Sequence, residues 1–353
     1  MTASETPEQA IARYRNALKG QRDPLARYPL LLGLAAAQAD AKWFEEAVES
    51  CDEATKINPD HHAGFAMLAS VMLDQGQIKE ASEAAFQALK RAPEDPATLN
   101  LATGVALRRG LAEAARKLAE ACLIQAPTNQ RALAHLGIAL AQLGRDTEAK
   151  HLIDFDHLLK IDSPPAPPGF DSIESFNRAV VDALTSRIDL NTRHVARTLV
   201  GGARLEDTFT LDAPIADTLL GMFTQATRDY RDELAVTLDH PVIKGKPEAF
   251  TISSWANIMD GAAYETAHMH EGSWLSGVYY PELSKPADGS EHGGAIEFGG
   301  HDFGSALQLS GPTRVVMPQA GMLVLFPSYF YHRTIPIDGP GRRISIAFDA
   351  KAS

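Results

Sequence analysis

The sequence predicts a multidomain α + β chain, in which an N-terminal α-solenoid of helical repeats precedes an antiparallel barrel or jelly roll with flanking helices. Three observations support this fold class: a 34-residue period in the first half, a proline-rich break, and a series of short strand-like segments in the last third. The length of 353 residues, with 45% hydrophobic and 22% charged residues, is typical of two folded domains.

The repeat is the strongest pattern in the first half of the chain. Pro59, Pro93 and Pro127 lie 34 residues apart, and each one ends a helical pattern. Small residues that allow close helix packing, and glycines that can end a helix, keep the same interval. These residues are Ala47, Ala81, Ala115, Ala149, Gly76, Gly110 and Gly144.

This pattern resembles the tetratricopeptide repeat, whose period is 34 residues. The resemblance covers about residues 28–161 as four units, preceded by a helix near residues 7–20, and the fourth unit has Ile161 where proline would fall. Repeats of this kind offer a concave surface, so the resemblance implies recruitment of a peptide, a protein partner or a second copy of the chain. The alternative is that the helices only shield the neighbouring domain.

The segment SPPAPPGF, residues 163–170, ends the helical pattern, because four prolines favour an extended connector. The predicted domains are therefore residues 1–162 and 171–353, joined by this linker. Helices are expected at 172–186 and 213–236. Seven strand-like segments follow from about residue 249: AFTISSWANIM, AAYETAHMH, LSGVYYPEL, GAIEFGG, TRVVMPQAG, MLVLFPS and RRISIAF.

Three histidines and an arginine stand out in these strands. His268 and His270 are two residues apart, so on a strand they point to the same face. His332 follows the apolar strand MLVLFPS, and Arg343 follows His332 by eleven residues. Arg343 and Ser345 also share a strand face. Imidazoles are metal ligands, and an arginine beside a hydroxyl matches a carboxylate.

The segments SGVYY, LVLFPSYFYHRTIP and RRISIAFD are similar to the 2-oxoglutarate/Fe(II) oxygenases that occur in bacteria as fusions to tetratricopeptide repeats. The resemblance covers about residues 195–353 and implies a double-stranded β-helix. It implies Fe(II) and 2-oxoglutarate as cofactors, dioxygen as co-substrate, and hydroxylation of a protein or peptide side chain recruited by the repeats. The positions that it assigns are His268, His270 and His332 for the metal, and Arg343 and Ser345 for the far carboxylate of 2-oxoglutarate.

One position departs from the usual motif, because His270 stands where that motif has a carboxylate. The site can therefore hold three histidines, two histidines and water, or a carboxylate from another strand. Glu297 is the first candidate for that carboxylate, followed by Glu271 and Glu265. We favour the three histidines; without an anionic ligand the iron keeps more positive charge, which predicts tighter binding of 2-oxoglutarate.

Five other residues are candidates for the pocket. Tyr279 and Tyr280 point to opposite faces of their strand, so Tyr280 can enter the barrel and donate a hydrogen bond from its hydroxyl to 2-oxoglutarate. Asn257 can line the same pocket. Trp274, His292 and His301 are candidates for binding the substrate. The ordinary alternatives are core packing for Trp274 and a loop at the barrel mouth for the two histidines.

Two other functions remain open. The chain can be a non-catalytic interaction scaffold with a degenerate jelly roll, or a cupin-like dioxygenase that uses three histidines without 2-oxoglutarate; Arg343 and Ser345 count against the second. The net charge of −12 argues against nucleic acid or an anionic membrane as partner, and two cysteines rule out a disulfide framework. No apolar run is long enough to span a bilayer and no leader pattern is apparent, which predicts a cytoplasmic protein. A homo-oligomer is a further alternative.

Overall fold

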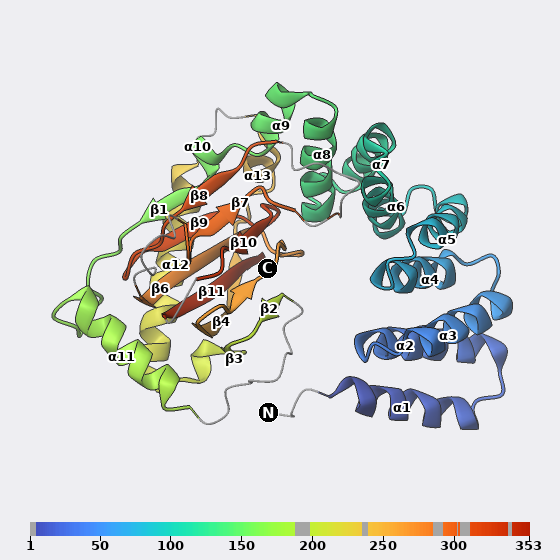
Figure 1. Cartoon of the computed structure of the whole chain (residues 1–353), viewed down its shortest axis with the longest axis horizontal. Helices are drawn as coiled ribbons and strands as arrows, with labels where there is room; N and C mark the ends of the chain where they lie inside the picture. The colour runs from blue at the N-terminus through green and yellow to red at the C-terminus, as the bar shows by residue number, and fades with distance from the viewer. Residues whose placement is uncertain are drawn as a thin grey trace. The chain divides into compact units, whose positions relative to one another are not determined.

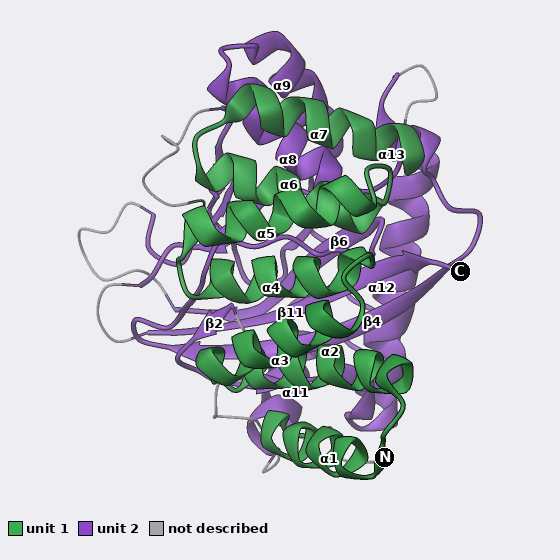
Figure 2. Ribbon diagram, turned by 90° about the vertical axis from the view of Figure 1, so that its right-hand side faces the viewer, with its two compact units in different colours: residues 1–127, 303–308 green, residues 128–302, 309–353 purple. Residues whose placement is uncertain are grey.

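The structure is a computed structural model that describes residues 5–187, 198–234, 239–284, 292–301, 303, 311–337 and 341–353. It confirms the predicted fold class, because helical repeats precede a domain rich in β-sheet (Figure 1). The predicted helix end at 235–236 lies outside the described residues. Figure 2 distinguishes two compact units, residues 1–127 with 303–308 and residues 128–302 with 309–353.

Unit 1 consists of one helix followed by three antiparallel helix pairs. In two of the pairs, the first helix begins with a proline that follows an aspartate. The side chains of these aspartates, Asp23 and Asp95, accept hydrogen bonds from N–H groups of the first helical turn. The helices are α1 (Pro7–Gly20), α2 (Pro24–Asp40), α3 (Phe44–Ile57), α4 (His62–Asp74), α5 (Ile78–Arg91), α6 (Pro96–Arg108) and α7 (Ala112–Gln125).

The turn within each pair has the left-handed backbone that the recurring glycines predict. Gly76, Gly110 and Gly144 have φ angles of 73°, 69° and 69°. Lys42 takes the equivalent position in the first pair with a φ of 62°, and it is the one non-glycine residue with positive φ in the described part of the chain. The 34-residue period is therefore a period of backbone geometry as well as of sequence.

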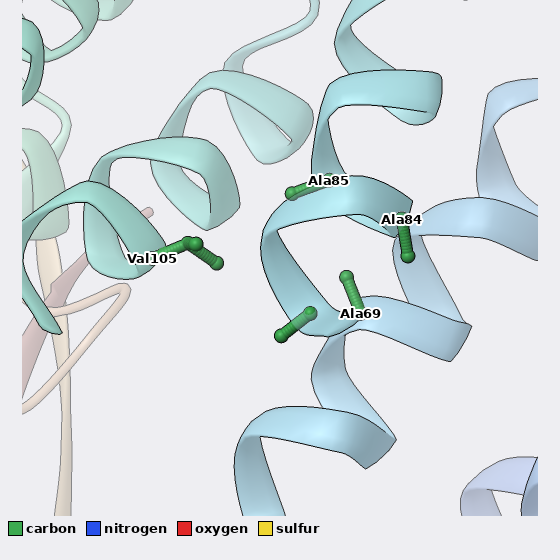
Figure 3. Packing of buried hydrophobic residues seen from close by; sticks show 5 residues of the cluster. Ala69, Ala84, Ala85 and Val105 are labelled. Carbon is green, nitrogen blue, oxygen red and sulfur yellow. The ribbon is translucent and has the colours of Figure 1, made fainter. Parts of the chain in front are cut away.

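Packing between the helices relies on small side chains. Figure 3 shows a cluster in which alanines of α4 and α5 face Val105 of α6. Ala69 and Ala81 are fully buried there, and Ala85 is 3% exposed. Methyl side chains let the helix backbones approach closely, which explains why the repeat keeps alanine at these positions.

The sequence predicts a fourth repeat unit that extends to residue 161. The corresponding helix pair lies in unit 2. Its second helix ends at Leu152, whose carbonyl accepts a hydrogen bond from the Tyr329 hydroxyl. Phe155 then packs edge-on against Phe330 with the ring centroids 5.2 Å apart. These contacts tie the pair to the strand-rich part of unit 2, which is called the β-domain below. The elements are α8 (Gln130–Gln142), α9 (Asp146–Leu152), α10 (Phe155–Leu158) and β1 (Lys160–Asp162).

The β-domain contains a six-stranded antiparallel sheet with the order β1-β9-β6-β11-β4-β3 and a three-stranded sheet with the order β10-β7-β8. The two sheets face each other through Phe298 and Phe326, whose ring centroids are 4.9 Å apart. The strands are β2 (Leu199–Val200), β3 (Ala203–Leu205), β4 (Phe250–Asp260), β5 (Tyr264–Glu265), β6 (Leu275–Leu283), β7 (Ile296–Phe298), β8 (Arg314–Val316), β9 (Leu323–Pro327), β10 (His332–Thr334) and β11 (Arg342–Ala352).

Helices cover the other face of the large sheet. Phe223 stacks on Phe348 of β11 with the ring centroids 4.3 Å apart, and Tyr279 of β6 donates a hydrogen bond to Asn177. Helical cover explains why β9 and much of β11 are buried on both faces. The helical elements are α11 (Ile173–Thr185), the short 3-10 helix η1 (Thr208–Thr210), α12 (Ala213–Glu233) and α13 (Pro241–Lys244). None of the described helices is both long and apolar enough to cross a membrane.

Gly277 in the SGVYY segment is required by this packing. A Cβ atom at Gly277 would overlap the ring of Phe348 and lie 3.0 Å from Leu325 Cδ2. We therefore expect Gly277→Ala to lower the free energy of unfolding by about 1–3 kcal/mol, the usual cost of overpacking a core. Urea denaturation measures this change. Gly221→Ala is the matched control, because an added Cβ there meets nothing within 4 Å, and an equal loss in both variants would contradict the explanation.

Candidate metal centre

Three histidines converge on one cavity of the β-domain. Each offers a ligand nitrogen, and these atoms of His268, His270 and His332 lie within 4.8 Å of one another. No other group of three or more potential ligands of this kind occurs among the described residues. The ring centroids of His268 and His332 are 4.3 Å apart, and that of His270 lies 5.2 Å and 5.1 Å from them.

Backbone hydrogen bonds hold the histidines in place, although the strand predicted to carry His268 and His270 is shorter than expected. The predicted strand AAYETAHMH is a strand only at β5, and His268 forms an isolated bridge with His332 through two backbone hydrogen bonds of 3.0 and 2.9 Å. The N–H of His270 donates to the carbonyl of Ser328 at 2.9 Å. His268 and His270 still face the same side, with their rings stacked at an interplanar angle of 21°.

Hydrogen bonds orient all three rings in the same sense. The Nδ1 atoms of His268 and His332 lie 2.7 and 3.0 Å from the carbonyl oxygens of Thr266 and Phe330. Because a carbonyl only accepts, both Nδ1 atoms must carry a proton, and each Nε2 then has a free lone pair. His270 Nδ1 lies 2.6 Å from Asp349 Oδ1. Outer partners of this kind are typical of metal-binding histidines.

The surroundings also favour the neutral form of two of these imidazoles. Burial lowers the pKa of His268 below its ordinary value. Burial, together with the nearby His268 and His270, lowers the pKa of His332 well below its ordinary value. A neutral imidazole is the form that binds a metal ion, so these two rings are ready to act as ligands near neutral pH.

Arg343 lies in the same cavity as the histidines. It is only 2% exposed, and its Nη2 donates to the Tyr280 hydroxyl at 3.2 Å. Its Nε and Nη1 atoms have no hydrogen-bond partner among the described residues. A buried guanidinium without a counterion is costly, so this cavity is suited to an anionic group that accepts two hydrogen bonds.

The strand register places the other pocket candidates around Arg343. Ser345 lines the cavity on the same face of β11, and Tyr280 lines it from β6. Burial raises the pKa of Tyr280, which keeps its hydroxyl protonated. Asn257 is opposite Ser345 in the β4–β11 register and fully buried, but it is not among the residues that line the cavity. Its Nδ2 donates to Glu265 Oε1 at 3.0 Å.

The candidate carboxylate Glu297 is not part of the histidine cluster. In the β7–β10 register Phe298 is opposite His332, and Glu297 is opposite Arg333. Its carboxylate is paired with Arg333 at 2.7 Å. Glu271, the second candidate, is paired with Arg131, while Glu265 lines the cavity.

The three candidates for substrate binding do not line the histidine cavity. Trp274 is 5% exposed, and its indole N–H donates to the carbonyl of Val242 at 3.0 Å, so it is a packing residue of the core. His292 is exposed and His301 is half-buried. Trp255, which was not singled out in the sequence, does line the cavity, with its ring centroid 5.3 Å from that of His270.

Asp349 is the main site residue that the sequence patterns left out. It follows Arg343, Ser345 and Ala347 on one face of β11, so the period-two rule that grouped Arg343 with Ser345 also leads to it. Burial alone would raise the pKa of Asp349, but the nearby His270 and hydrogen bonds from His270, Ser276 and Ser273 lower it below its ordinary value. The carboxylate is therefore ionised beside His270.

Two family models match the chain. The model described as "Putative 2OG-Fe(II) oxygenase" matches residues 253–349, which include all three histidines, Arg343 and Asp349. A tetratricopeptide repeat model matches residues 39–103. The chain therefore combines a region that matches tetratricopeptide repeats with a region that matches the putative 2OG-Fe(II) oxygenase family, as the sequence motifs predict.

Solved structures resemble parts of the chain. A prolyl-4-hydroxylase of Pseudomonas putida is 17% identical, with 63% of this chain and 99% of that chain covered and a TM-score of 0.40. MamA is 20% identical over 42% of this chain and 85% of that chain, with a TM-score of 0.37. A thermophilic tetratricopeptide-repeat protein of Thermus thermophilus is 18% identical over 42% and 80%, with a TM-score of 0.36. No curated protein matches the sequence.

Proposed function

We propose that the chain is an Fe(II)- and 2-oxoglutarate-dependent dioxygenase that hydroxylates a protein or peptide side chain recruited by its repeats. One observation carries this proposal. The three imidazoles line the same cavity as a buried arginine, and two of that arginine's nitrogens have no partner among the described residues. A metal-ligand set beside an unsatisfied carboxylate-binding group is what an enzyme needs to hold a metal ion and a dicarboxylic acid together.

The histidines fit Fe(II). His268, His270 and His332 would bind the ion through Nε2, since each Nδ1 already has an acceptor partner. Imidazole is a ligand that suits Fe(II), and three ligands on one side leave further positions for small molecules. The paired carboxylates of Glu297 and Glu271 do not compete for this role, because each is held by an arginine.

Arg343 and its neighbours fit the far carboxylate of 2-oxoglutarate. Two adjacent N–H groups of Arg343 would donate to its two oxygens as a fork, one from Nη2 and the other from Nε or Nη1, which have no partner among the described residues. The side chains of Ser345 and Tyr280 line the same cavity. Asn257 would support this wall from behind, where it is hydrogen-bonded to Glu265. Lysine could not replace the fork geometry of Arg343.

Bound Fe(II) and 2-oxoglutarate would supply the oxidative chemistry that protein side chains lack. The contribution of the chain is to bind, orient and enclose these groups. Apolar side chains, among them Val278, Ile296 and Phe326, line the same cavity and would exclude water from it. Trp255 lines the cavity beside His270, and we propose that it contacts the substrate.

Recruitment of a protein or peptide is supported by the repeats. Stacked helix pairs form extended concave surfaces that suit a peptide chain, and the repeat model matches residues 39–103. In this proposal the repeats bind the polypeptide and the β-domain modifies one of its side chains.

The test is an anaerobic titration of metal-free protein with Fe(II) and then with 2-oxoglutarate. We expect a saturable visible charge-transfer band, because chelation of the metal by the 2-oxo acid produces one. Metal binding without this band would favour a three-histidine dioxygenase that does not use 2-oxoglutarate. Absence of both metal binding and the band would make the β-domain a scaffold and overturn the proposal.

A further inference from the structure

The groups that are hydrogen-bonded to the Nδ1 atoms of the three histidines differ in charge. His268 and His332 hydrogen-bond to neutral backbone carbonyls two residues away in sequence, while His270 hydrogen-bonds to the Asp349 carboxylate, which comes from β11. His270 is the ring that stands where the usual motif has a carboxylate. Among the described residues, the one carboxylate that is hydrogen-bonded to a histidine of the cluster therefore contacts this unusual ligand.

Asp349 is itself held in place by the sheet. It is 9% exposed, and its Oδ1 accepts a hydrogen bond from Ser276 Oγ at 2.7 Å, in addition to the contact with His270. Ser276 is its register partner on β6 and also lies 2.8 Å from Ser328 Oγ. The carboxylate oxygen thus has fixed donors on two sides, and rotation of Asp349 would break both.

We propose that Asp349 is a positioning residue that fixes His270 with the proton on Nδ1 and supplies the negative charge that three imidazoles lack. This inference rests on the proposed function. A carboxylate behind a ligating histidine directs the ring, selects its tautomer and raises its basicity. The negative charge of the usual motif is kept in this chain, but it is moved from the metal to the far side of His270.

The geometry argues against Asp349 as a metal ligand in its own right. Its Oδ1 lies 2.6 Å from Nδ1, the ring nitrogen of His270 that is turned away from the free Nε2. Asp349 is also absent from the cluster of potential ligands and from the cavity lining. It therefore acts through His270.

The first test compares metal affinity in the full chain. We expect Asp349→Asn, which keeps the size and removes the charge, to weaken Co(II) and Fe(II) binding by about 10–100-fold in anaerobic titrations. The melting temperature of the metal-free variant shows whether it is folded at the temperature of the titration. Asp154→Asn is the matched control, because Asp154 makes the same contact to a histidine, His157 Nδ1 at 2.7 Å, outside the cavity. It should bind metal as the wild type does.

A wild-type affinity in Asp349→Asn would overturn the positioning role and leave the proposed function standing. Failure of the wild-type protein to bind metal would overturn both. If Asp349→Asn does not fold, nitrogen NMR of the zinc-loaded wild-type protein decides the question without any variant. We expect His270 to bind zinc through Nε2 while Nδ1 keeps its proton; binding through Nδ1, or no binding by His270, would refute the inference.

Discussion

Arg343→Met should abolish measurable 2-oxoglutarate binding and leave metal binding intact. The guanidinium is 2% exposed, and its Nε and Nη1 atoms have no partner among the described residues. Hydrogen bonds to charged groups contribute about 1.5–3 kcal/mol each, so the loss of two should weaken 2-oxoglutarate binding on the order of 100-fold or more. The charge-transfer titration measures this loss, and zinc or Co(II) binding shows that the histidines still function.

The same variant should have an unusual effect on stability. Truncating a buried, well-packed side chain normally destabilises a protein, but Arg343 carries a buried charge with no salt bridge among the described residues. Replacing it with an apolar side chain of similar length should therefore leave the urea-unfolding free energy of the ligand-free protein unchanged or raise it. Added 2-oxoglutarate should stabilise the metal-loaded wild type but not the variant.

Arg342→Met provides the matched control. Arg342 is the neighbouring residue on β11, but it faces the other side and pairs with Asp260 at 3.0 Å near the surface. It should bind 2-oxoglutarate as the wild type does. Equal losses in Arg342→Met and Arg343→Met would show that β11 tolerates no substitution and that Arg343 has no special role.

The repeat helices were predictable because their signals are local. Proline, alanine and glycine recur at a fixed interval, and each acts within its own turn or helix pair. Lys42 lacks the glycine signal and still adopts the left-handed geometry, which the sequence pattern did not predict. The early end of α9 at Leu152 and the strand β1 were not predictable. Leu152 accepts a hydrogen bond from Tyr329, and β1 pairs with β9, so both depend on residues far away in sequence.

In the candidate site, too, features set by local spacing could be predicted and features set by contacts between distant segments could not. Spacing along one strand groups Arg343 with Ser345, and it could also have identified Asp349, which lies four residues beyond Ser345 on the same face. Pairing between strands is not a local property. Glu297 was the first candidate for a carboxylate from another strand, but the β7–β10 register places Phe298 and not Glu297 opposite His332. A shift by one residue would have reversed this result.

Removing single histidines should distinguish the three ligand sets that the sequence leaves open. We expect His332→Ala and His270→Ala each to reduce Fe(II) affinity by more than the 10–100-fold typical of losing an outer partner. His332 is 6% exposed, and its ring centroid lies 4.3 Å from that of His268 and 5.1 Å from that of His270, so its loss removes one of the three converging ligand nitrogens. Anaerobic calorimetry with Fe(II), and metal analysis after dialysis, would measure the loss.

His270→Ala carries the decisive information, because each ligand set predicts a different outcome. If two histidines and water hold the ion, His270→Ala should keep nearly wild-type affinity while His332→Ala loses it. If Glu297 is the third ligand, Glu297→Gln should lose affinity as strongly as His332→Ala. With three histidine ligands, Glu297→Gln should bind normally, because this carboxylate is paired with Arg333. His157→Ala, an exposed histidine outside the cavity, is the control for substitution itself.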